Sequence, residues 1–561
     1  MGPVSNLYDY IIVGGGVSGV VIASRLRSAL PNAHILVLEA GKDESDFEPA
    51  RYVKNIASVR GSEIDYSFDT VPQRHLDGRP KKAWAGRALS GGGAINVGAW
   101  LRGPAVDFDH WAELLQDDSW AFSSLLPYFC KSETFISKDL DPNLHGSDGP
   151  MEIKLNKDIR HGKWYPLCEQ LKGAWQESDP SLKWNPDVNS GDPLGMGDWP
   201  TTFTRAERQF PHKAYNLEGV EVQTNSLVKR VIIERAEPIG EPKATGVEMA
   251  DGRVICSRKE VIVCGGTYNS PKVLLLSGVG PASQLGKHGI TVRVDLSAVG
   301  QGLCDDMTMR QVWRLRHPER GLSFGSPLMT DRDLVSNVPV DFFIWTQAPH
   351  DLIREAFAKD GITDSHLFNP HAVHQEMYTM WMAGRSAALL AQLGLSNDGS
   401  LICTSAYNMY PLSRGSVSLG SADPTVPPLI DPNYYAAEAD RVIFRDALRK
   451  QMRALLATES GKSFVAAEVP PPGFASISHE SSDEEIDQRV RVFAETGSHP
   501  CGTCAMGRVV DTRLRVKGVK GLRVVDASVF ASPIATHHQA AVYAVAEKGA
   551  SMIAADWEEG A

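Results

Sequence analysis

A glycine-rich turn near the N-terminus gives the clearest chemical signal in the sequence. It has the sequence GGGVSG over Gly14–Gly19 and lies between an apolar run and a helical pattern. Glu39 comes 20 residues after Gly19. Glycines in this pattern allow a tight turn, let a pyrophosphate approach a helix N-terminus, and permit close packing of helix on strand. The acidic residue accepts hydrogen bonds from ribose hydroxyls. The pattern therefore predicts a dinucleotide site, without deciding between FAD and NAD.

The elements that must position this turn are visible in the same region. Tyr8–Val13 is a short continuous apolar run, as in a buried parallel strand. A helical pattern follows over Val20–Leu30, and His34–Leu38 is a second apolar run. Together these segments predict a strand–helix–strand unit with the glycine turn at its first junction.

Later segments predict further elements. Residues 215–235 and 244–266 contain strand-like runs, and a helix is expected at Ser270–Leu276. Ala439–Leu456 has an apolar stripe on one side, which indicates a helix that faces the core. Residues 521–554 predict a strand, a turn and a terminal helix.

Composition limits the class of protein. The chain has 561 residues, of which 42% are hydrophobic and 22% charged, and this excludes a disordered or disulfide-stapled scaffold. The formal net charge of −11 argues against a general nucleic-acid binder, which would show a basic face. No stretch approaches the ~20 apolar residues that span a bilayer. Because residues 1–10 show no secretory signal, we expect a soluble, cytoplasmic protein.

Neither the cysteines nor the histidines predict a metal site. The eight cysteines are sparse for this length and are expected to be free, mostly buried thiols. Cys501 and Cys504 form a CxxC pair, but no second pair or redox motif accompanies it. His371 and His374 are spaced i, i+3 without a third ligand nearby. We expect the cysteine pair and the histidine pair to have structural roles, and we expect no bound metal.

Several other segments resemble the landmarks of the glucose-methanol-choline (GMC) family of FAD-dependent oxidoreductases. Gly86–Gly103, within a glycine-rich block at residues 81–111, is similar to the first signature of that family, and Gly266–Gly280 is similar to the second. The remaining landmarks are matched, in the same order, by Ser413–Leu419, Pro428–Tyr435, Ser498–Gly507, Val524–Phe530 and Tyr543–Ala550. The resemblance covers nearly the whole chain, and several motifs in order are more specific than any one of them.

The resemblance implies an α/β fold with two domains. One is a Rossmann-like, discontinuous FAD-binding domain, and the other is a substrate-binding domain with an antiparallel sheet flanked by helices. The expected FAD-binding domain comprises residues 1–154, 215–310 and 491–561, and the substrate-binding domain residues 155–214 and 311–490. Residues 311–400 match no usable pattern, so the substrate stays undefined.

The resemblance also implies which residues bind the cofactor. Gly92, Asn96 and Ala99 fall in the loop beside the flavin, Val228 meets the adenine, and Asp526 lies near the ribityl chain and pyrophosphate. Some members attach FAD covalently through a histidine just before this asparagine. Ile95 occupies that position here, so noncovalent FAD is expected. The expected cofactor-binding residues are Gly14, Gly15, Gly16, Gly19, Glu39, Gly92, Asn96, Ala99, Val228, Asp526, Ala527 and His538.

Two histidines correspond to the catalytic pair of the family. His499 lies in a His-Pro-x-Gly-Thr-Cys block and corresponds to the base, a task that suits an imidazole because its pKa lies near neutral pH. His537, ten residues before Glu547, corresponds to the partner that hydrogen-bonds the substrate oxygen, and His538 is the alternative after a one-residue shift. His538 is otherwise expected at the pyrimidine edge of the flavin. Asp306 stands where histidine is common, so a contact there is expected to differ.

The function that the resemblance implies is FAD-dependent oxidation of a small, aromatic or secondary-metabolite alcohol, with hydride passing to flavin N5. The electron acceptor would be O2 or another molecule, because the sequence does not separate an oxidase from a dehydrogenase. It also leaves the oligomeric state open. An alternative keeps the flavin but performs non-redox chemistry, as a lyase, cyclase or photodecarboxylase. A non-catalytic scaffold on the same fold is a third hypothesis, and the intact histidine pair argues against it.

Overall fold

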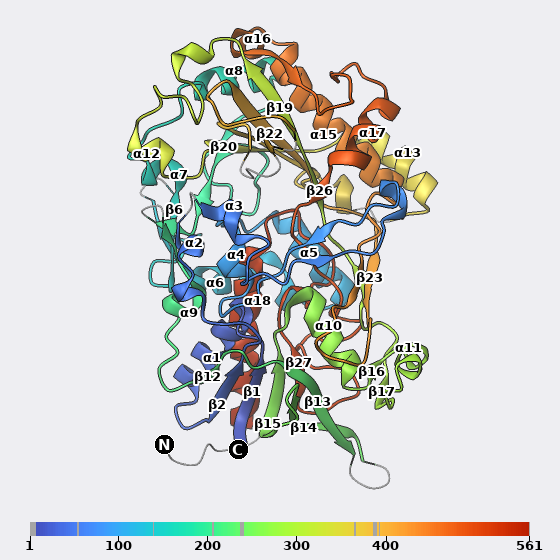
Figure 1. The fold of residues 1–561 in the computed structure, drawn as a ribbon. Coiled ribbons are helices and arrows are strands. Elements are labelled where there is room, and N and C mark those ends of the chain that lie inside the picture. The colour runs from blue at the N-terminus through green and yellow to red at the C-terminus, as the bar shows by residue number, and fades with distance from the viewer. Residues whose placement is uncertain are drawn as a thin grey trace.

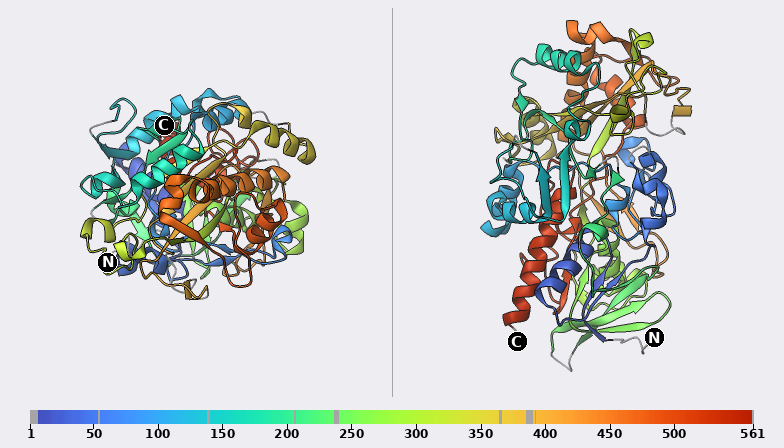
Figure 2. Two further views of the ribbon diagram at one scale, coloured as in Figure 1. Left: turned by 90° about the horizontal axis from the view of Figure 1, so that it is seen from above. Right: turned by 90° about the vertical axis from the view of Figure 1, so that its left-hand side faces the viewer.

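The computed structural model describes residues 7–52, 55–137, 140–204, 207–235, 240–363, 366–384, 390–391 and 393–559. The molecule is elongated, with a large sheet toward each end and both chain termini at the same end (Figures 1 and 2). The seven-stranded sheet lies at the end with the termini, and the eight-stranded sheet lies at the other end. The mixed α/β class predicted from the sequence is confirmed.

The seven-stranded sheet contains the predicted strand–helix–strand unit. Its order is β12-β2-β1-β15-β14-β13, with β27 also paired to β15. The strands are β1 (Leu7–Val13), β2 (Ile35–Leu38), β12 (Glu221–Gln223), β13 (Val228–Arg235), β14 (Pro242–Met249), β15 (Val254–Val263) and β27 (Leu522–Val524). Strand β2 pairs in parallel with both β12 and β1. Strand β15 pairs in parallel with both β1 and β27. The carboxyl ends of these parallel strands therefore meet at one edge, where open α/β sheets bind ligands.

Two helices that are far apart in the sequence support this sheet. Helix α1 (Val17–Ala29) packs on β1 and β2, and α18 (Gln539–Glu559) lies beside α1 (Figure 2). Both were predicted from the sequence, with α1 beginning three residues earlier and α18 extending five residues beyond the expected end. The predicted helix Ser270–Leu276 is the end of α10 (Gly266–Leu276), which contacts β13. The turn into α18 brings the C-terminal part of the chain to the carboxyl edge of the sheet.

The eight-stranded sheet is antiparallel except at one edge. Its order is β25-β19-β22-β21-β20-β8-β7, with β26 also paired to β19. The strands are β7 (Trp184–Asn185), β8 (Gly195–Asp198), β19 (Met307–Leu315), β20 (Phe342–Thr346), β21 (Gln375–Met380), β22 (Leu401–Asn408), β25 (Val465–Val469) and β26 (Glu495–Thr496). The predicted long helix is α15 (Glu438–Leu456), which packs on β21 and β22 with its apolar residues buried. Only β7 and β8 run in parallel among these pairs.

The register of these strands gathers polar and aromatic residues on one face. Arg310 and Tyr378 both pair with Ser405, from the two sides of β22, and Tyr407 pairs with Glu376. Since side chains alternate between the faces of a strand, these five residues share one face of the sheet. Their neighbours along the strands form the opposite face, against which α15 packs.

The remaining sequence predictions on organisation have mixed outcomes. The glycine-rich block at residues 81–111 contains the short helix α4 (Gly92–Ile95) and enters α5 (Ala105–Leu115), as predicted. Two expected domain boundaries fall inside strands, at β6 (Met151–Leu155) and at β19. The division into domains therefore stays a proposal. Among the described residues, no helix combines the length and apolar character that crossing a membrane requires.

Candidate active site

A large cavity connects the two sheets. It has a volume of about 860 Å³ and extends from the carboxyl edge of the seven-stranded sheet to Arg310, Tyr378 and Tyr407 on the eight-stranded sheet. This volume is typical of ligand and cofactor sites. Twelve of the predicted site residues line it: Gly14, Gly16, Glu39, Gly92, Asn96, Ala99, Val228, His499, Asp526, Ala527, His537 and His538. Gly15 and Gly19 are not among the residues that line the cavity.

The glycines of the first turn have different physical roles. Gly14 has a φ of +107°, and a Cβ there would lie 2.3 Å from the carbonyl oxygen of Cys264. A Cβ on Gly19 would lie 2.0 Å from the carbonyl oxygen of Gly14, so helix and turn touch through backbone atoms. Gly16 differs, because its nearest contact would be 3.7 Å away, at Gly91. Gly16 and Gly91 therefore leave a backbone-lined approach to the N-terminus of α1, where an anionic group is favoured.

Glu39 directly follows β2 and is buried at the cavity wall. Its two carboxylate oxygens accept hydrogen bonds from the backbone N–H groups of Gly15, at 2.8 Å, and Gly41, at 2.7 Å. Burial raises the pKa of Glu39 to about 7, while these hydrogen bonds oppose that shift. Each oxygen keeps a second lone pair, so the carboxylate can also accept from hydroxyl groups of a ligand.

Other predicted cofactor residues are held by networks of hydrogen bonds. The buried Asp526 accepts from the Gly266 backbone N–H at 2.9 Å and from the Ser270 hydroxyl at 2.5 Å, which fixes the end of β27 against α10. Asn96 follows α4, accepts from a guanidinium N–H of Arg208 at 2.7 Å, and donates to Gln539. The cavity wall also includes Gly92 in α4, Ala99, and Val228 at the start of β13. Ala527 begins the turn after β27.

Three histidines meet at the opposite end of the cavity. The ring centroids of His499 and His537 are 4.5 Å apart with nearly perpendicular planes, and the ring of His538 is 5.3 Å from that of His499. His499 follows β26 on a short loop, whereas the other two directly precede α18. Burial lowers the pKa values of His499 and His538 well below the usual range. The uncharged imidazole of His499 can therefore accept a proton.

Asp306 is the carboxylate partner of His499. Its Oδ2 lies 2.8 Å from Nδ1 of His499, and the backbone N–H of His499 donates to Asp305 Oδ1 at 2.9 Å. Burial raises the pKa of Asp306 to about 8. Near neutral pH Asp306 therefore holds a proton that it can donate to Nδ1, and above about pH 8 it accepts from Nδ1–H instead. Only the second arrangement leaves the lone pair on Nε2 of His499 free to act as a base.

Glu376 is the carboxylate partner of His537. Its Oε1 lies 2.9 Å from Nε2 of His537, and its Oε2 accepts from the indole N–H of Trp345 at 3.0 Å. Burial alone would lower the pKa of His537, but the charge and hydrogen bond of Glu376 outweigh it and raise that pKa. His537 is therefore suited to a cationic, hydrogen-bond-donating role, with Nδ1 left for a ligand.

Several site residues were not identified from the sequence. Glu376, Arg310, Tyr378 and Tyr407 all come from strands of the eight-stranded sheet. The one signal available was the presence of an acidic residue in the otherwise apolar and aromatic stretch around residues 375–382. Asp306 was identified only as a departure from a pattern, and its contact with His499 explains why that position matters.

The Asp306–His499 contact leads to a prediction about rate and pH. Asp306→Asn should lower the maximal kcat/KM by roughly 10- to 100-fold, because the imidazolium formed at His499 loses its counter-ion. In the unaltered protein kcat/KM should rise with pH through about 8, as Asp306 ionises. That limb should be absent from the variant. Steady-state rates between pH 6 and 10 check both points.

The same variant has a clear contrary outcome. Asp306 does not line the cavity, so Asp306→Asn should keep its cofactor content. An unchanged pH profile with an unchanged rate would show that Asp306 does not act through His499. Asp333→Asn, at a partly exposed position that pairs with Lys163, serves as the matched control.

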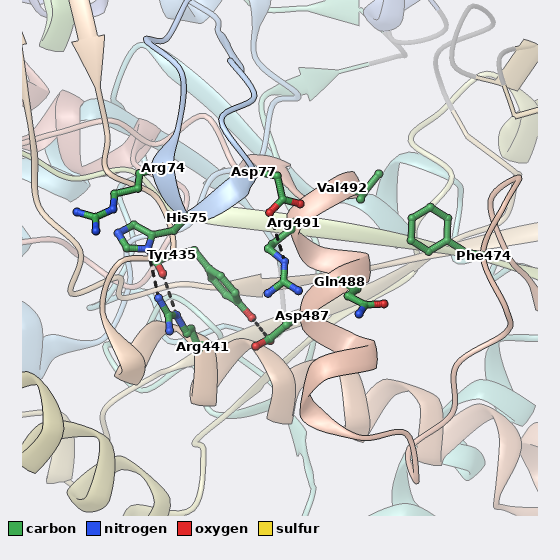
Figure 3. A pocket seen from close by; sticks show the side chains of 10 residues that line it. All are labelled: Arg74, His75, Asp77, Tyr435, Arg441, Phe474, Asp487, Gln488, Arg491 and Val492. Carbon is green, nitrogen blue, oxygen red and sulfur yellow. Dashed lines mark hydrogen bonds and ion pairs between the residues drawn. The ribbon is translucent and has the colours of Figure 1, made fainter.

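A second, smaller cavity of about 470 Å³ lies outside this site and contains none of the predicted residues (Figure 3). Several of its polar groups are paired with one another or with neighbouring residues. The Tyr435 hydroxyl donates to Asp487 at 2.6 Å, and Arg491 pairs with Glu484 at 2.5 Å. Arg441 donates to the backbone oxygen of Tyr435 at 3.0 Å. With its charges satisfied in this way, this cavity offers no acid–base pair comparable with the histidine cluster.

Comparison with known proteins decides the family. Residues 8–308 and 411–546 match the two family models described as GMC oxidoreductase. The chain is 36% identical to the GMC-type oxidoreductase acuG of Aspergillus aculeatus, over 98% of this chain and all of that protein. The chain belongs to the GMC oxidoreductase family. This confirms the resemblance found in the sequence and the class of an oxidoreductase that acts on CH–OH groups.

More distant GMC relatives cover the same length. The pyranose dehydrogenase 3 of Leucoagaricus meleagris is 29% identical, over 98% of this chain and 93% of that protein. A crystal structure of formate oxidase superposes with a TM-score of 0.86 at 27% identity, covering 99% of each chain. GMC membership supports FAD as the cofactor, and the formate oxidase of Aspergillus oryzae is a solved neighbour studied for modification of its FAD.

Proposed function

We propose that this protein oxidises an alcohol with bound FAD, and that His499 is the base. The observation that supports the proposal most is the continuity of one cavity from the glycine turn to the His499–His537 pair. A dinucleotide held at the first end would reach the imidazoles at the second. The aromatic walls formed by Tyr378 and Tyr407 favour an aromatic or secondary-metabolite alcohol.

The residues present fit FAD. Gly16 and Gly91 leave space for a pyrophosphate at the start of α1, and Glu39 can accept from ribose hydroxyls. His538 keeps a buried Nδ1 without a partner among the described residues, at the place expected for the pyrimidine edge. Bound FAD would supply the hydride acceptor. We propose that it is noncovalent, because the side chain of Ile95 has no nucleophile.

The chain itself would position the alcohol and move its proton. Nε2 of His499 would take the hydroxyl proton, and Asp306 would stabilise the resulting imidazolium through Nδ1. His537 would donate a hydrogen bond from Nδ1 to the substrate oxygen, while Glu376 holds its Nε2. Positioning of this kind can contribute several kcal/mol to lowering the barrier.

The test begins with the purified protein in air. A yellow protein that releases flavin into the supernatant on acid denaturation supports noncovalent FAD, and retention of colour in the pellet would contradict it. Peroxide formation with aryl or aliphatic alcohols identifies an oxidase. Turnover only with a quinone or dye identifies a dehydrogenase.

The same assay tests the alternative function. Conversion of a substrate while the flavin spectrum stays oxidised would replace alcohol oxidation by a lyase, cyclase or photodecarboxylase reaction. Illuminated and dark samples separate the last of these from the other two.

A further inference from the structure

Arg310 lines the candidate active-site cavity and has no hydrogen-bond or ion-pair partner for its guanidinium among the described residues. It lies in the middle of β19, is only partly exposed, and lines the cavity wall. Within the part of the chain that the structure describes, its guanidinium donates no hydrogen bond and forms no ion pair within 4 Å. A guanidinium stays protonated in proteins, and a half-buried charge without a partner is costly. A ligand group that pairs with it would remove that cost.

The surroundings of Arg310 place it close to the reacting end of the cavity. Its charge interacts with Tyr378 and Tyr407, whose hydroxyl groups are 3.2 Å apart. The ring of Tyr407 is 5.9 Å from that of His537 and 6.5 Å from that of His499. Arg310, the two tyrosines and the histidine pair therefore line the same cavity, with Tyr407 beside the histidines.

The other charges at this end do not neutralise Arg310. Glu495 lines the cavity and acts on Arg310 through its charge, but it is an exposed residue beyond ion-pair distance. Arg60 also lines the cavity, and its charge acts on His499. The carboxylates of Glu39 and Asp526 lie at the opposite end, beside the glycine turn and α10. Glu376 and Asp306 also lie at this end, but each is paired with a histidine, His537 and His499 respectively. Among the described residues, no carboxylate at the substrate end lies within ion-pair distance of Arg310.

We propose that Arg310 binds a carboxylate of the substrate, so that the preferred alcohol also carries an acid group. This inference rests on the proposed function and names its substrate class. Arginine pairs with carboxylates through two parallel hydrogen bonds, which gives direction as well as affinity. Tyr378 and Tyr407, which line the same cavity, offer aromatic walls to a flat spacer, such as a benzene ring, between the carboxylate and the hydroxyl-bearing carbon.

The first experiment measures binding without turnover. Benzoate and the neutral, equally shaped benzamide are titrated into the purified holoenzyme by calorimetry. Benzoate should bind at least 10-fold more tightly, and Arg310→Gln should remove the difference by weakening benzoate alone. Arg314→Gln, an exposed arginine four residues along the same strand, should leave it intact. Arg310→Lys should weaken the binding of benzoate several-fold and leave the affinity for benzamide unchanged. This variant keeps the test available if the Gln variant is unstable.

The contrary outcomes are distinct from failure of the proposed function. Equal affinity for benzoate and benzamide would overturn the role of Arg310. So would a benzoate preference that survives Arg310→Gln, or one that disappears in Arg60→Gln instead. In the turnover assay, 4-(hydroxymethyl)benzoate should exceed 4-(hydroxymethyl)benzamide in kcat/KM, and this ratio should fall to about one in Arg310→Gln. A benzoate preference that depends on Arg310, found in a protein that oxidises no alcohol, would reject the proposed function and leave the anion site standing.

Discussion

His499→Ala should lower the rate of alcohol oxidation by about 10²- to 10⁴-fold while the protein keeps its flavin. The reason is that Nδ1 of His499 is held by Asp306, which leaves Nε2 as the atom able to take the hydroxyl proton. The burial that lowers the pKa of His499 also keeps the imidazole uncharged. His537 does not replace it, because Glu376 holds that imidazole in the cationic form favoured by its raised pKa.

The measurement is anaerobic loss of flavin absorbance after mixing with an alcohol, which isolates the step that involves the base. His161→Ala is the matched control, since that side chain is 76% exposed and remote from the cavity. A His499→Ala variant with a nearly unchanged rate would remove His499 from its proposed role. Partial recovery of the variant by added imidazole would support it.

Gly14→Ala should give a protein that no longer retains flavin and is less stable by roughly 2–4 kcal/mol. At a φ of +107° an L-residue is strained, and its Cβ would lie 2.3 Å from the carbonyl oxygen of Cys264. Gly14 and Cys264 directly follow the paired strands β1 and β15. The Cβ would meet a backbone oxygen, so no side chain can move aside to relieve the contact. The turn and the start of α1 must therefore shift together.

Flavin absorbance relative to protein and the midpoint of urea unfolding check this result. Gly16→Ala separates the two effects, because a Cβ there has room within the protein but points to the space beside Gly91. It should reduce flavin retention with little loss of stability. Gly286→Ala, in open space on α11 (Ala282–Lys287), should change neither. A yellow Gly14→Ala variant of normal stability would contradict the proposed role of the turn.

The part of this molecule that could be predicted from the sequence depends on local patterns. The strand, turn and helix around Gly14 have strong signals of their own, because a buried parallel strand is continuously apolar and only glycine fits the turn. The long helix α15 shows its core-facing stripe directly. The histidine pair was found only because the motifs around it resemble those of a family, since nothing in the local sequence distinguishes His499 from other histidines.

The carboxylates and the cavity wall could not be predicted because they depend on strand register. Glu376 meets His537 across 161 residues, and Asp306 meets His499 across 193. Tyr378 and Arg310 face the cavity because both pair with Ser405. A shift of the strand register by one residue would turn these side chains toward α15 instead. The sequence of an antiparallel strand that is buried on both faces does not show which face is which.

The order of the chain has a consequence for how the protein is made. Strand β27 and helix α18, which complete the seven-stranded sheet and cover α1, are translated after all the other strands of that sheet. Asp526, His537 and His538 of the cavity belong to the same late segment, and His499 precedes it on the loop after β26. A nascent chain that ends before β27 therefore has the glycine turn but not the rest of the proposed binding site. Cofactor capture must therefore wait for this segment, and a chain that lacks it has an unsatisfied sheet edge that molecular chaperones can recognise.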